Sequence, residues 1–394
     1  MTSAITPQPP TPQSSGPIRK PAAGPVAQLT GEVVYLYAFD VAYEMTRFPV
    51  RELLGQPVAQ FVVDASKRSP RHLFFYRPQM VRLPPLERLG PRGPMRLERT
   101  VKLLPVGAIS ITVRVPFGVP SLDELVAFHD LRFSDGTYLY DEVCALAEEL
   151  KNALKPYAIR PVEKLGDEEA YTVFCINGPL TSTQGSGVSA EAWLQSSRRE
   201  VAALLTEERD PRQLSDQEAE ESTGKYFSYY ERDLVVIDWD AALIVDEPKY
   251  FDEVLYIMEL ANLQLAELEA YDRILDTAVD RSYRDLSLSR FRGAPVVQRE
   301  LREIRVDLAR LSDELSNITK FFGDWHLARI YQGVSVRFHL ADWHRTIDEK
   351  LKTLDDLYQI LRSDQNNRMM LILEATIVLL FIIDLVILFV GLGK

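Results

Sequence analysis

The sequence is poor in the residues that build metal and disulfide sites. Its 394 residues include two cysteines, Cys144 and Cys175, and five histidines. A cysteine pair this far apart cannot form a cysteine-rich zinc module and gives no sign of an oxidising compartment. The signatures of nucleophile elbows, zinc proteases, Walker loops and dinucleotide-binding turns are also absent from the sequence. We therefore predict no catalytic residue and no cofactor.

Positive charge is scarce as well. The 45 Lys and Arg residues against 57 Asp and Glu residues give a net charge of −12, which argues against a general nucleic-acid binder. With 26% charged and 46% hydrophobic residues, the composition is that of a globular protein of two or three domains. It excludes a fully disordered chain and a polytopic transporter.

Long apolar runs are absent until the C-terminal segment 369–392. Seventeen of these 24 residues are Leu, Ile, Val or Phe. Together they favour membrane insertion by roughly 5–10 kcal/mol, whereas Asp384 opposes it by about 2.5–3.5 kcal/mol. At about 1.5 Å per residue the segment is about 36 Å long, and a hydrocarbon core is about 30 Å thick. We predict one transmembrane helix, with 368–394 as a tail anchor in the lipid bilayer.

Charged residues in and before this anchor suggest its neighbours and its orientation. Glu374 and Asp384 are expected to face other helices rather than lipid, which predicts a homo-oligomer or a membrane-protein partner. Lys352, Arg362 and Arg368 precede the anchor and favour a cytoplasmic location for the soluble part. The membrane would be the bacterial cytoplasmic membrane, or the mitochondrial inner membrane in a eukaryote.

The N-terminal segment 1–29 has a different composition. It contains seven prolines, no acidic residue, and only Arg19 and Lys20 as charges. Proline at this density prevents helices and sheet ladders, so we predict a disordered tail. The segment lacks the apolar core of a secretory signal.

The segment 30–246 mixes strand and helix patterns, which predicts an α+β domain. Expected strands cover 32–39, 72–77, 106–115 and 171–176, and a hairpin joins 226–230 to 234–239. Expected helices cover 121–131, 139–154 and 189–208. Asp238 and Asp240 would share one side of the second hairpin strand, either as a metal-binding pair or as a solvent-facing edge.

The segment 247–367 has the pattern of packed helices. Apolar residues recur at spacings of three and four over 251–290, and again over 301–322 and 340–361. Such seams predict an antiparallel helical bundle or a coiled-coil stalk. Asp272 falls on the first seam, where a polar residue commonly fixes the register of the helices.

Two Asp-Trp-His triplets, at 324–326 and 342–344, lie on either side of Gly333. If the chain reverses at Gly333, the triplets and His339 come together as a metal site. Otherwise they cap helices and pack a corner. The first arrangement would make the protein a membrane-bound metal-dependent hydrolase.

The segment 67–102 is basic, with ten Lys or Arg residues and two Glu residues. Arginine suits phosphate contacts, so one interpretation is that the run binds RNA or a ribosome, anionic lipid headgroups, or an acidic surface of the same protein. The other interpretation is a solvated strand-loop-strand whose charge is balanced by the acidic domain. The candidate anion-binding residues are Lys67, Arg68, Arg71, Arg77, Arg82, Arg88, Arg92, Arg96, Arg99 and Lys102.

Three segments carry a likeness to a known family: YFSYYERDLVVIDWD at 226–240, KFFGDWHLARIYQ at 320–332, and the heptad helix with its anchor at 351–386. In these the chain resembles the required-for-meiotic-nuclear-division family. The chain differs from that family in having Asp238 before Trp239 where the family has Phe-Trp, in a shortened segment after the hairpin, and in Asp384. The resemblance implies an α+β domain, a helical region and one C-terminal membrane helix. It also implies a scaffolding role, with mitochondrial members similar to translation-support factors, and it supplies no catalytic residue.

These patterns together predict a non-enzymatic, membrane-anchored scaffold. Its α+β domain would stand on a helical stalk and recruit partners at the membrane. The alternatives are the metal-dependent hydrolase and an RNA or ribosome tether.

Overall fold

The computed structural model describes residues 28–46, 50–61, 78–90, 92–105, 107–166, 168–178, 188–288, 306 and 325–391. Three predictions concern segments outside this part of the chain. They are the tail at 1–29, apart from residues 28 and 29, the strand at 72–77, and the heptad stretch at 301–322, apart from residue 306.

A mixed sheet forms the centre of the N-terminal domain. In the described part of the chain it has nine strands, in the order β11-β12-β13-β10-β1-β8-β7-β6-β5. The strands are β1 (Leu29–Asp40), β5 (Ala59–Gln60), β6 (Gln79–Gly90), β7 (Gly93–Leu103), β8 (Ala108–Val119), β10 (Glu169–Asn177), β11 (Tyr226–Phe227), β12 (Leu234–Ile237) and β13 (Ala241–Asp246). Strands β10 and β13 are parallel, and the other neighbours are antiparallel. The strands expected at 32–39, 106–115 and 171–176 and the 226–239 hairpin are confirmed.

Two further strand pairs lie outside this sheet. Strand β2 (Ala42–Met45) pairs with β9 (Ala158–Pro161), and β3 (Glu52–Leu53) pairs with β4 (Gln56–Pro57). The chain also forms short 3-10 turns, η2 (Lys155–Tyr157), η3 (Pro211–Gln213) and η4 (Pro248–Tyr250).

The helices between the strands agree with the sequence pattern to different degrees. Helix α1 (Leu139–Leu154) has the predicted bounds. The helix expected at 189–208 is divided into α2 (Ala190–Ser196) and α3 (Arg198–Leu205), and α4 (Asp216–Thr223) follows. The segment expected to be helical at 121–131 forms the short 3-10 helix η1 (Asp123–Phe128) instead.

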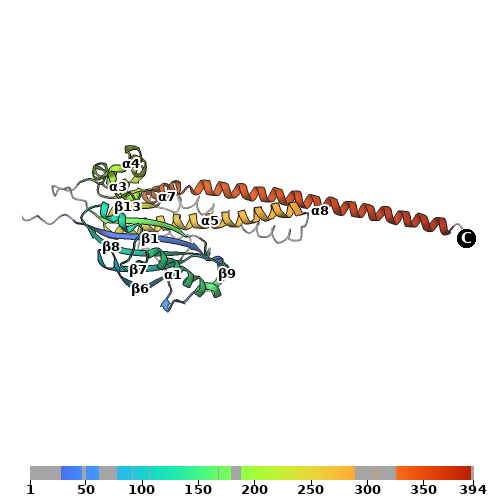
Figure 1. Cartoon of the computed structure of the whole chain (residues 1–394), viewed down its shortest axis with the longest axis horizontal. Coiled ribbons are helices and arrows are strands. Elements are labelled where there is room, and N and C mark those ends of the chain that lie inside the picture. The colour runs from blue at the N-terminus through green and yellow to red at the C-terminus, as the bar shows by residue number, and fades with distance from the viewer. Residues whose placement is uncertain are drawn as a thin grey trace, which may run out of the picture.

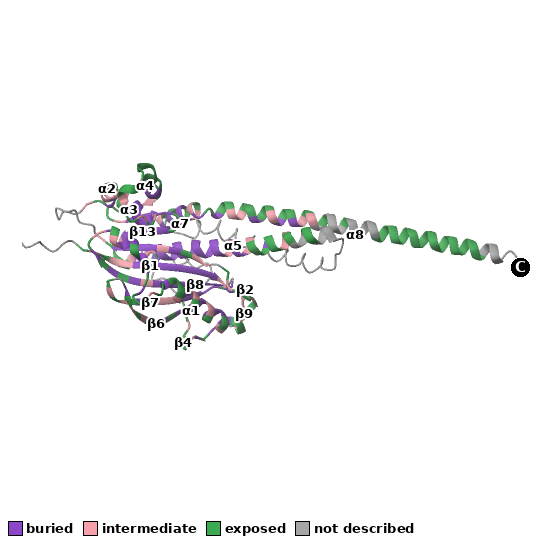
Figure 2. Ribbon diagram, in the orientation of Figure 1, coloured by how far each residue is buried: buried purple, intermediate pink, exposed green. Residues whose placement is uncertain are grey.

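Each central strand contributes to two hydrophobic cores because successive side chains point to opposite faces. In β1, Val34, Leu36 and Ala38 belong to the core beneath the C-terminal helices. Their neighbours Val33 and Tyr35 belong to the core that η1, α1, α2 and α3 cover. Figure 2 shows the buried residues running along the sheet and along α5.

Three helices of the C-terminal region are described: α5 (Phe251–Leu288), α7 (Trp325–Arg337) and α8 (Leu340–Gly391). The first part of α5 packs directly on the sheet, so the body and the predicted stalk share one core. Helices α5 and α8 lie side by side and run in the same direction (Figure 1). This pair does not test the antiparallel arrangement predicted for 247–367, because the first and third helices of an antiparallel bundle are also parallel to each other and the middle stretch, 301–322, lies outside the described residues apart from residue 306.

Polar contacts hold this parallel pair in register. The Nζ atom of Lys350 on α8 is 2.6 Å from a carboxylate oxygen of Asp272 and 2.6 Å from one of Asp276 on α5. Asp272 thus forms a cross-helix ion pair at the seam position that was expected to fix register.

The chain does not reverse at Gly333, as the metal hypothesis required. Gly333 lies inside α7, and α7 joins α8 through Phe338 and His339, whose φ of 50° interrupts the helix. A Cβ atom at position 333 would come within 2.5 Å of the Phe227 ring. Glycine is present because α7 approaches the hairpin closely, not because the chain turns there.

The C-terminal half of α8 extends away from the rest of the chain (Figure 1). Residues Met369–Ile387 have a mean hydropathy of 2.7, and none of this segment is buried. In the described part of the chain it is the one helix long and apolar enough to span a membrane.

Candidate functional site

The outer half of the sheet presents polar side chains towards α5. On β7 and β8 these residues are Glu98, Thr100, Lys102, Ser110, Thr112 and Arg114. Their sequence neighbours are apolar and belong to the core on the opposite face: Leu97, Val101, Leu103, Ile109, Ile111 and Val113. Helix α5 packs on β1, β10 and β8 and leaves this polar face partly uncovered.

A polar groove lies between this face and the start of α5. Its volume is about 590 Å³, within the usual range for small-molecule sites. The described lining residues are Leu36, Phe61, Met80, Arg82, Leu83, Pro85, Glu98, Arg99, Thr100, Lys102, Thr112, Arg114, Asp252, Leu255, Tyr256 and Glu259. We refer to this site as the polar groove.

The buried carboxylate of Glu259 lies at the floor of the polar groove. One of its oxygens accepts a hydrogen bond from the ammonium of Lys102, and the other accepts hydrogen bonds from the hydroxyls of Ser110 and Thr112. Glu259 is 3% exposed and Lys102 is 8% exposed. The Nζ atom of Lys102 also lies 4.1 Å from the centroid of the Phe61 ring. A buried ion pair is tolerated where such additional bonds satisfy its polar atoms.

Arg114 is compensated inside the polar groove by carboxylates. It forms ion pairs with Glu32, at 3.2 Å, and with Asp252. Burial lowers the pKa of Arg114, but Glu32 and Asp252 outweigh this effect and raise it above its ordinary value. Burial raises the pKa of Glu32, and Arg114 partly opposes that shift. Burial and the charge of Glu259 likewise raise the pKa of Tyr256.

Where it is described, at 78–90 and 92–102, the predicted basic run does not form one continuous surface. Arg82, Arg99 and Lys102 line the polar groove. Lys67, Arg68, Arg71 and Arg77 lie outside the described residues.

Outside the groove, part of the basic run is paired with acidic residues of the same domain. Arg88 pairs with Glu142 of α1, and Arg92 pairs with Glu124 of η1. Arg96 is exposed on β7. An acidic surface of the same protein, one of the three predicted partners, thus accounts for Arg88 and Arg92.

Sequence reasoning missed two central members of the groove, Arg114 and Glu259. A signal for Arg114 was present, because Ser110, Thr112 and Arg114 alternate with apolar residues in the expected strand 106–115. Glu259 gave no comparable signal, since it lies 157 residues from Lys102 in the chain.

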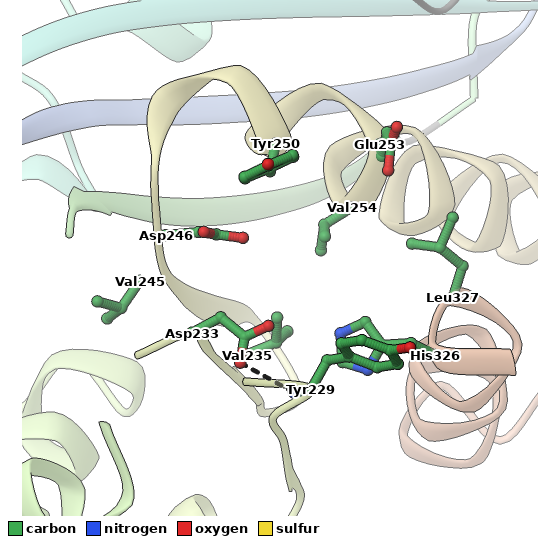
Figure 3. Close-up of a pocket in the computed structure, with 10 residues that line it drawn as sticks. All are labelled: Tyr229, Asp233, Val235, Val245, Asp246, Tyr250, Glu253, Val254, His326 and Leu327. Carbon is green, nitrogen blue, oxygen red and sulfur yellow. Dashed lines mark hydrogen bonds between the residues drawn. The ribbon is translucent and has the colours of Figure 1, made fainter. Parts of the chain in front are cut away.

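A second, much smaller pocket lies where β12 and β13 meet the starts of α5 and α7 (Figure 3). Asp233 accepts hydrogen bonds from the backbone N–H groups of Tyr229 and Tyr230, each at 2.8 Å, which fixes the hairpin turn. The His326 ring packs against Tyr229 with 5.5 Å between centroids. With a volume of about 50 Å³, this pocket is too small for a metabolite.

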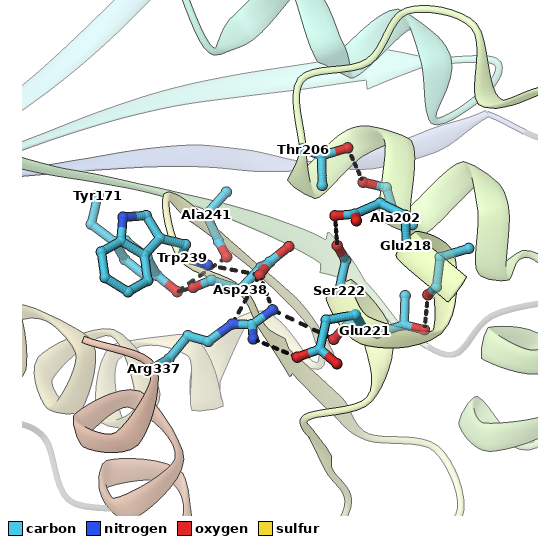
Figure 4. Close-up of polar contacts among 12 residues, drawn as sticks. Tyr171, Ala202, Thr206, Glu218, Glu221, Ser222, Asp238, Trp239, Ala241 and Arg337 are labelled. Carbon is cyan, nitrogen blue, oxygen red and sulfur yellow. Dashed lines mark hydrogen bonds and ion pairs between the residues drawn. The ribbon is translucent and has the colours of Figure 1, made fainter. Parts of the chain in front are cut away.

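Asp238 and Asp240 do not share one side of a strand, which corrects the sequence-based expectation. They lie in the turn between β12 and β13, where Asp238 is buried and Asp240 is exposed. Figure 4 shows the guanidinium of Arg337, on α7, in contact with Asp238 and with Glu221. The Nε atom of Arg337 donates a 2.9 Å hydrogen bond to Oδ1 of Asp238. Tyr171 donates a 3.0 Å hydrogen bond to the Asp238 carbonyl. Asp238 therefore joins α7 to the sheet.

The described histidines do not gather into a metal site. His326 lies on α7 and His344 on α8, and His339 contacts Asp342 on its own turn at 3.1 Å. Asp324 lies outside the described residues. Across the ranges that the structure covers, no three His, Cys, Asp or Glu side chains are grouped closely enough to hold a metal ion.

Comparison with known proteins gives a family without an assigned activity. The family model described as "Uncharacterized protein MJ0711, N-terminal domain" matches residues 30–252. The uncharacterized protein MJ0711 of Methanocaldococcus jannaschii is 23% identical over 248 residues, which cover 60% of this chain and 72% of that relative. No solved structure matches the chain significantly.

Proposed function

Because the chain belongs to the MJ0711 N-terminal domain family, whose description names no activity, we propose its function from its architecture. It is a non-enzymatic, membrane-anchored scaffold whose α+β body recruits partners on the cytoplasmic side. The observation that supports this proposal is the helix α8. Its first turns belong to the core of the body, and none of its apolar segment Met369–Ile387 is buried.

Exposing an apolar helix of this kind to water is energetically unfavourable, whereas the same helix is stable in lipid. All 19 residues of Met369–Ile387 present their side chains outward, although large apolar patches are rare on soluble monomers. Insertion into a bilayer removes this surface from water and satisfies the helix backbone internally. We infer that α8 is both the membrane anchor and the connection to the body.

The same helix sets the distance between the body and the bilayer. At about 1.5 Å per residue, α8 is about 44 Å long between Leu340 and Met369, and about 22 Å of this lies beyond Leu354, its last described buried residue. Leu340, Ile347, Leu351 and Leu354 are buried against neighbouring elements, which stiffens the first part of this span. The body is therefore held away from the membrane surface rather than against it.

Removal of residues 368–394 should release the protein from membranes. We expect the full chain in the membrane pellet after alkaline carbonate extraction, and the shortened chain in the supernatant. Circular dichroism of the shortened chain checks that its body remains folded. A full chain that dissolves in carbonate would contradict the anchor.

The acidic residues in the span lead to a proposal about oligomers. Asp384 costs about 2.5–3.5 kcal/mol when it faces lipid at the middle of a span, so we propose that it and Glu374 face a neighbouring helix. Asp384→Leu should then lower the yield of cross-linked homo-oligomers in membranes several-fold. Leu385→Ala, on the same turn, serves as the control. An unchanged yield for Asp384→Leu would exclude this role.

We favour the scaffold over the two alternative functions. The metal-dependent hydrolase requires a donor cluster that the described histidines do not form. An RNA or ribosome tether would need basic residues free to contact phosphate, and Arg88 and Arg92 instead form ion pairs within the domain. The resemblance to the required-for-meiotic-nuclear-division family agrees with the scaffold and adds no site residue.

A further inference from the structure

Three hydrogen-bond donors of the polar groove lie on one face of two adjacent strands. In the β6–β7 register, Arg82 is opposite Thr100, and Met80 is opposite Lys102. Arg82 and Lys102 are therefore diagonal neighbours on the same face, about 7–8 Å apart between Cα atoms, with Thr100 between them. All three line the polar groove.

These donors are not fully used inside the protein. An ammonium group has three hydrogens, and among the described residues the one carboxylate that Lys102 contacts is Glu259, whose second oxygen is bound by Ser110. Arg82 is exposed and has no carboxylate partner in the described part of the chain. Arg114, by contrast, is compensated by Glu32 and Asp252. Within the described residues, Arg82 thus keeps an uncompensated positive charge, whereas the charge of Lys102 is balanced by Glu259 and its ammonium has more N–H groups than that carboxylate accepts.

We propose that the polar groove binds the phosphate group of a small, soluble molecule. Arg82 supplies the uncompensated positive charge and binds two phosphate oxygens through its planar guanidinium. Lys102, whose charge is balanced by Glu259, donates an N–H group, and Thr100 donates from its hydroxyl. Glu259 orients Lys102 and is not itself a ligand. The ten candidate anion-binding residues of the basic run are thereby replaced by a site of three residues, Arg82, Thr100 and Lys102. Arg88, Arg92 and Arg96 are not part of this site.

The size of the groove favours a small molecule over a macromolecule. A volume of about 590 Å³ matches a metabolite-sized ligand, whereas RNA binding would require a long positive surface that the ion pairs of Arg88 and Arg92 interrupt.

The position of the groove favours a soluble phosphate over a lipid headgroup. The groove lies at the start of α5, and α8 runs about 44 Å from Leu340, which is buried in the core of the body, to the apolar segment. About 22 Å of this helix lies beyond Leu354, its last described buried residue. Even the shorter length is more than twice the Debye length of about 8 Å at physiological salt, so headgroups of the same bilayer exert little attraction here.

The test uses the full chain in nanodiscs of zwitterionic phosphatidylcholine. Inorganic phosphate and pyrophosphate are titrated separately by isothermal calorimetry at low ionic strength. We expect saturable binding, weakened about tenfold by Arg82→Gln and several-fold by Thr100→Val. The matched control is Arg96→Gln, which removes the same charge from an exposed residue of β7 outside the groove and should leave the affinity unchanged. Thermal melting verifies that each variant is folded.

Three outcomes would overturn the proposal. The first is the absence of saturable binding to both probes. The second is an equal loss in Arg82→Gln and Arg96→Gln, which would indicate general electrostatic attraction. The third is Arg82-dependent binding to phosphatidylglycerol vesicles or to a single-stranded RNA oligonucleotide in the absence of any phosphate binding. That result would assign the residues to a lipid or an RNA surface.

Discussion

Glu259→Ala is expected to lower the free energy of unfolding by about 3–5 kcal/mol. Lys102 is 8% exposed, and the substitution removes the carboxylate that pairs with its ammonium. It also removes the acceptor of the Ser110 hydroxyl. An uncompensated charge in a buried position costs more than the original pair contributed. The measurement is chemical denaturation of the detergent-solubilised chain, followed by far-ultraviolet circular dichroism.

Two controls separate this effect from a general loss of packing. Glu98→Ala removes a carboxylate from the exposed part of the same groove and should change the free energy of unfolding by less than about 0.5 kcal/mol. Glu259→Leu combined with Lys102→Met replaces both charges by apolar groups and should recover most of the loss. If Glu259→Ala and Glu98→Ala have equal effects, the buried ion pair is not what stabilises this region.

Asp238→Ala is the second substitution with a large expected effect, a loss of about 3 kcal/mol in the free energy of unfolding. The carboxylate is 8% exposed and Arg337 is 17% exposed, so the remaining guanidinium stays partly buried with only Glu221 beside it. Because Arg337 lies at the end of α7, the substitution should also loosen α7 from the hairpin. Hydrogen exchange of the α7 amides measures this second effect.

A double-mutant cycle with Arg337→Ala isolates the contribution of the pair. We expect a coupling free energy of about 1–3 kcal/mol between positions 238 and 337. Asp240→Ala is the matched control, because Asp240 is an exposed aspartate in the same turn. Additive effects at 238 and 337 would show that the two residues stabilise the protein independently.

Sequence patterns predicted the strands that follow a simple alternation, but for the β6–β7 hairpin they gave only a strand-loop-strand within 67–102, without strand bounds. Prolines at 84, 85 and 94 exclude a regular helix here, and proline is also unfavourable inside a strand. In the structure, Pro84 and Pro85 fall within the register shift between Leu83 and Leu86, where the ladder is interrupted. A bulge accommodates residues that cannot donate to the ladder, so these prolines do not end the strand.

The arrangement of the C-terminal helices was predicted only in part. The apolar spacing of 251–290 and 340–361 gave the helices α5 and α8, because that spacing reflects the seam itself. It carries no information about direction, since a seam repeats identically in parallel and antiparallel pairs. The contact between Lys350 and Asp272, 78 residues apart in the chain, identifies the register that the pattern left open.

The candidate site was the least predictable part of the molecule. The basic run identified Arg82, Arg99 and Lys102 by residue type alone, and it could not separate them from Arg88 and Arg92, which pair on other elements. The distinction depends on β-strand alternation and on Glu259, which is brought to the sheet by α5. Both require the tertiary structure.

The continuity of α8 has a geometric consequence for the direction that the body faces. A helix advances by about 100° and 1.5 Å per residue, so a single residue inserted between Leu354 and Met369 would swing the sheet by more than a quarter turn about the helix axis. Seven inserted residues would nearly restore the original orientation of the sheet about the helix axis and move it about 10 Å further from the apolar segment. The length of the helix between Leu354 and Met369 therefore sets which side of the body faces a given direction around the helix axis.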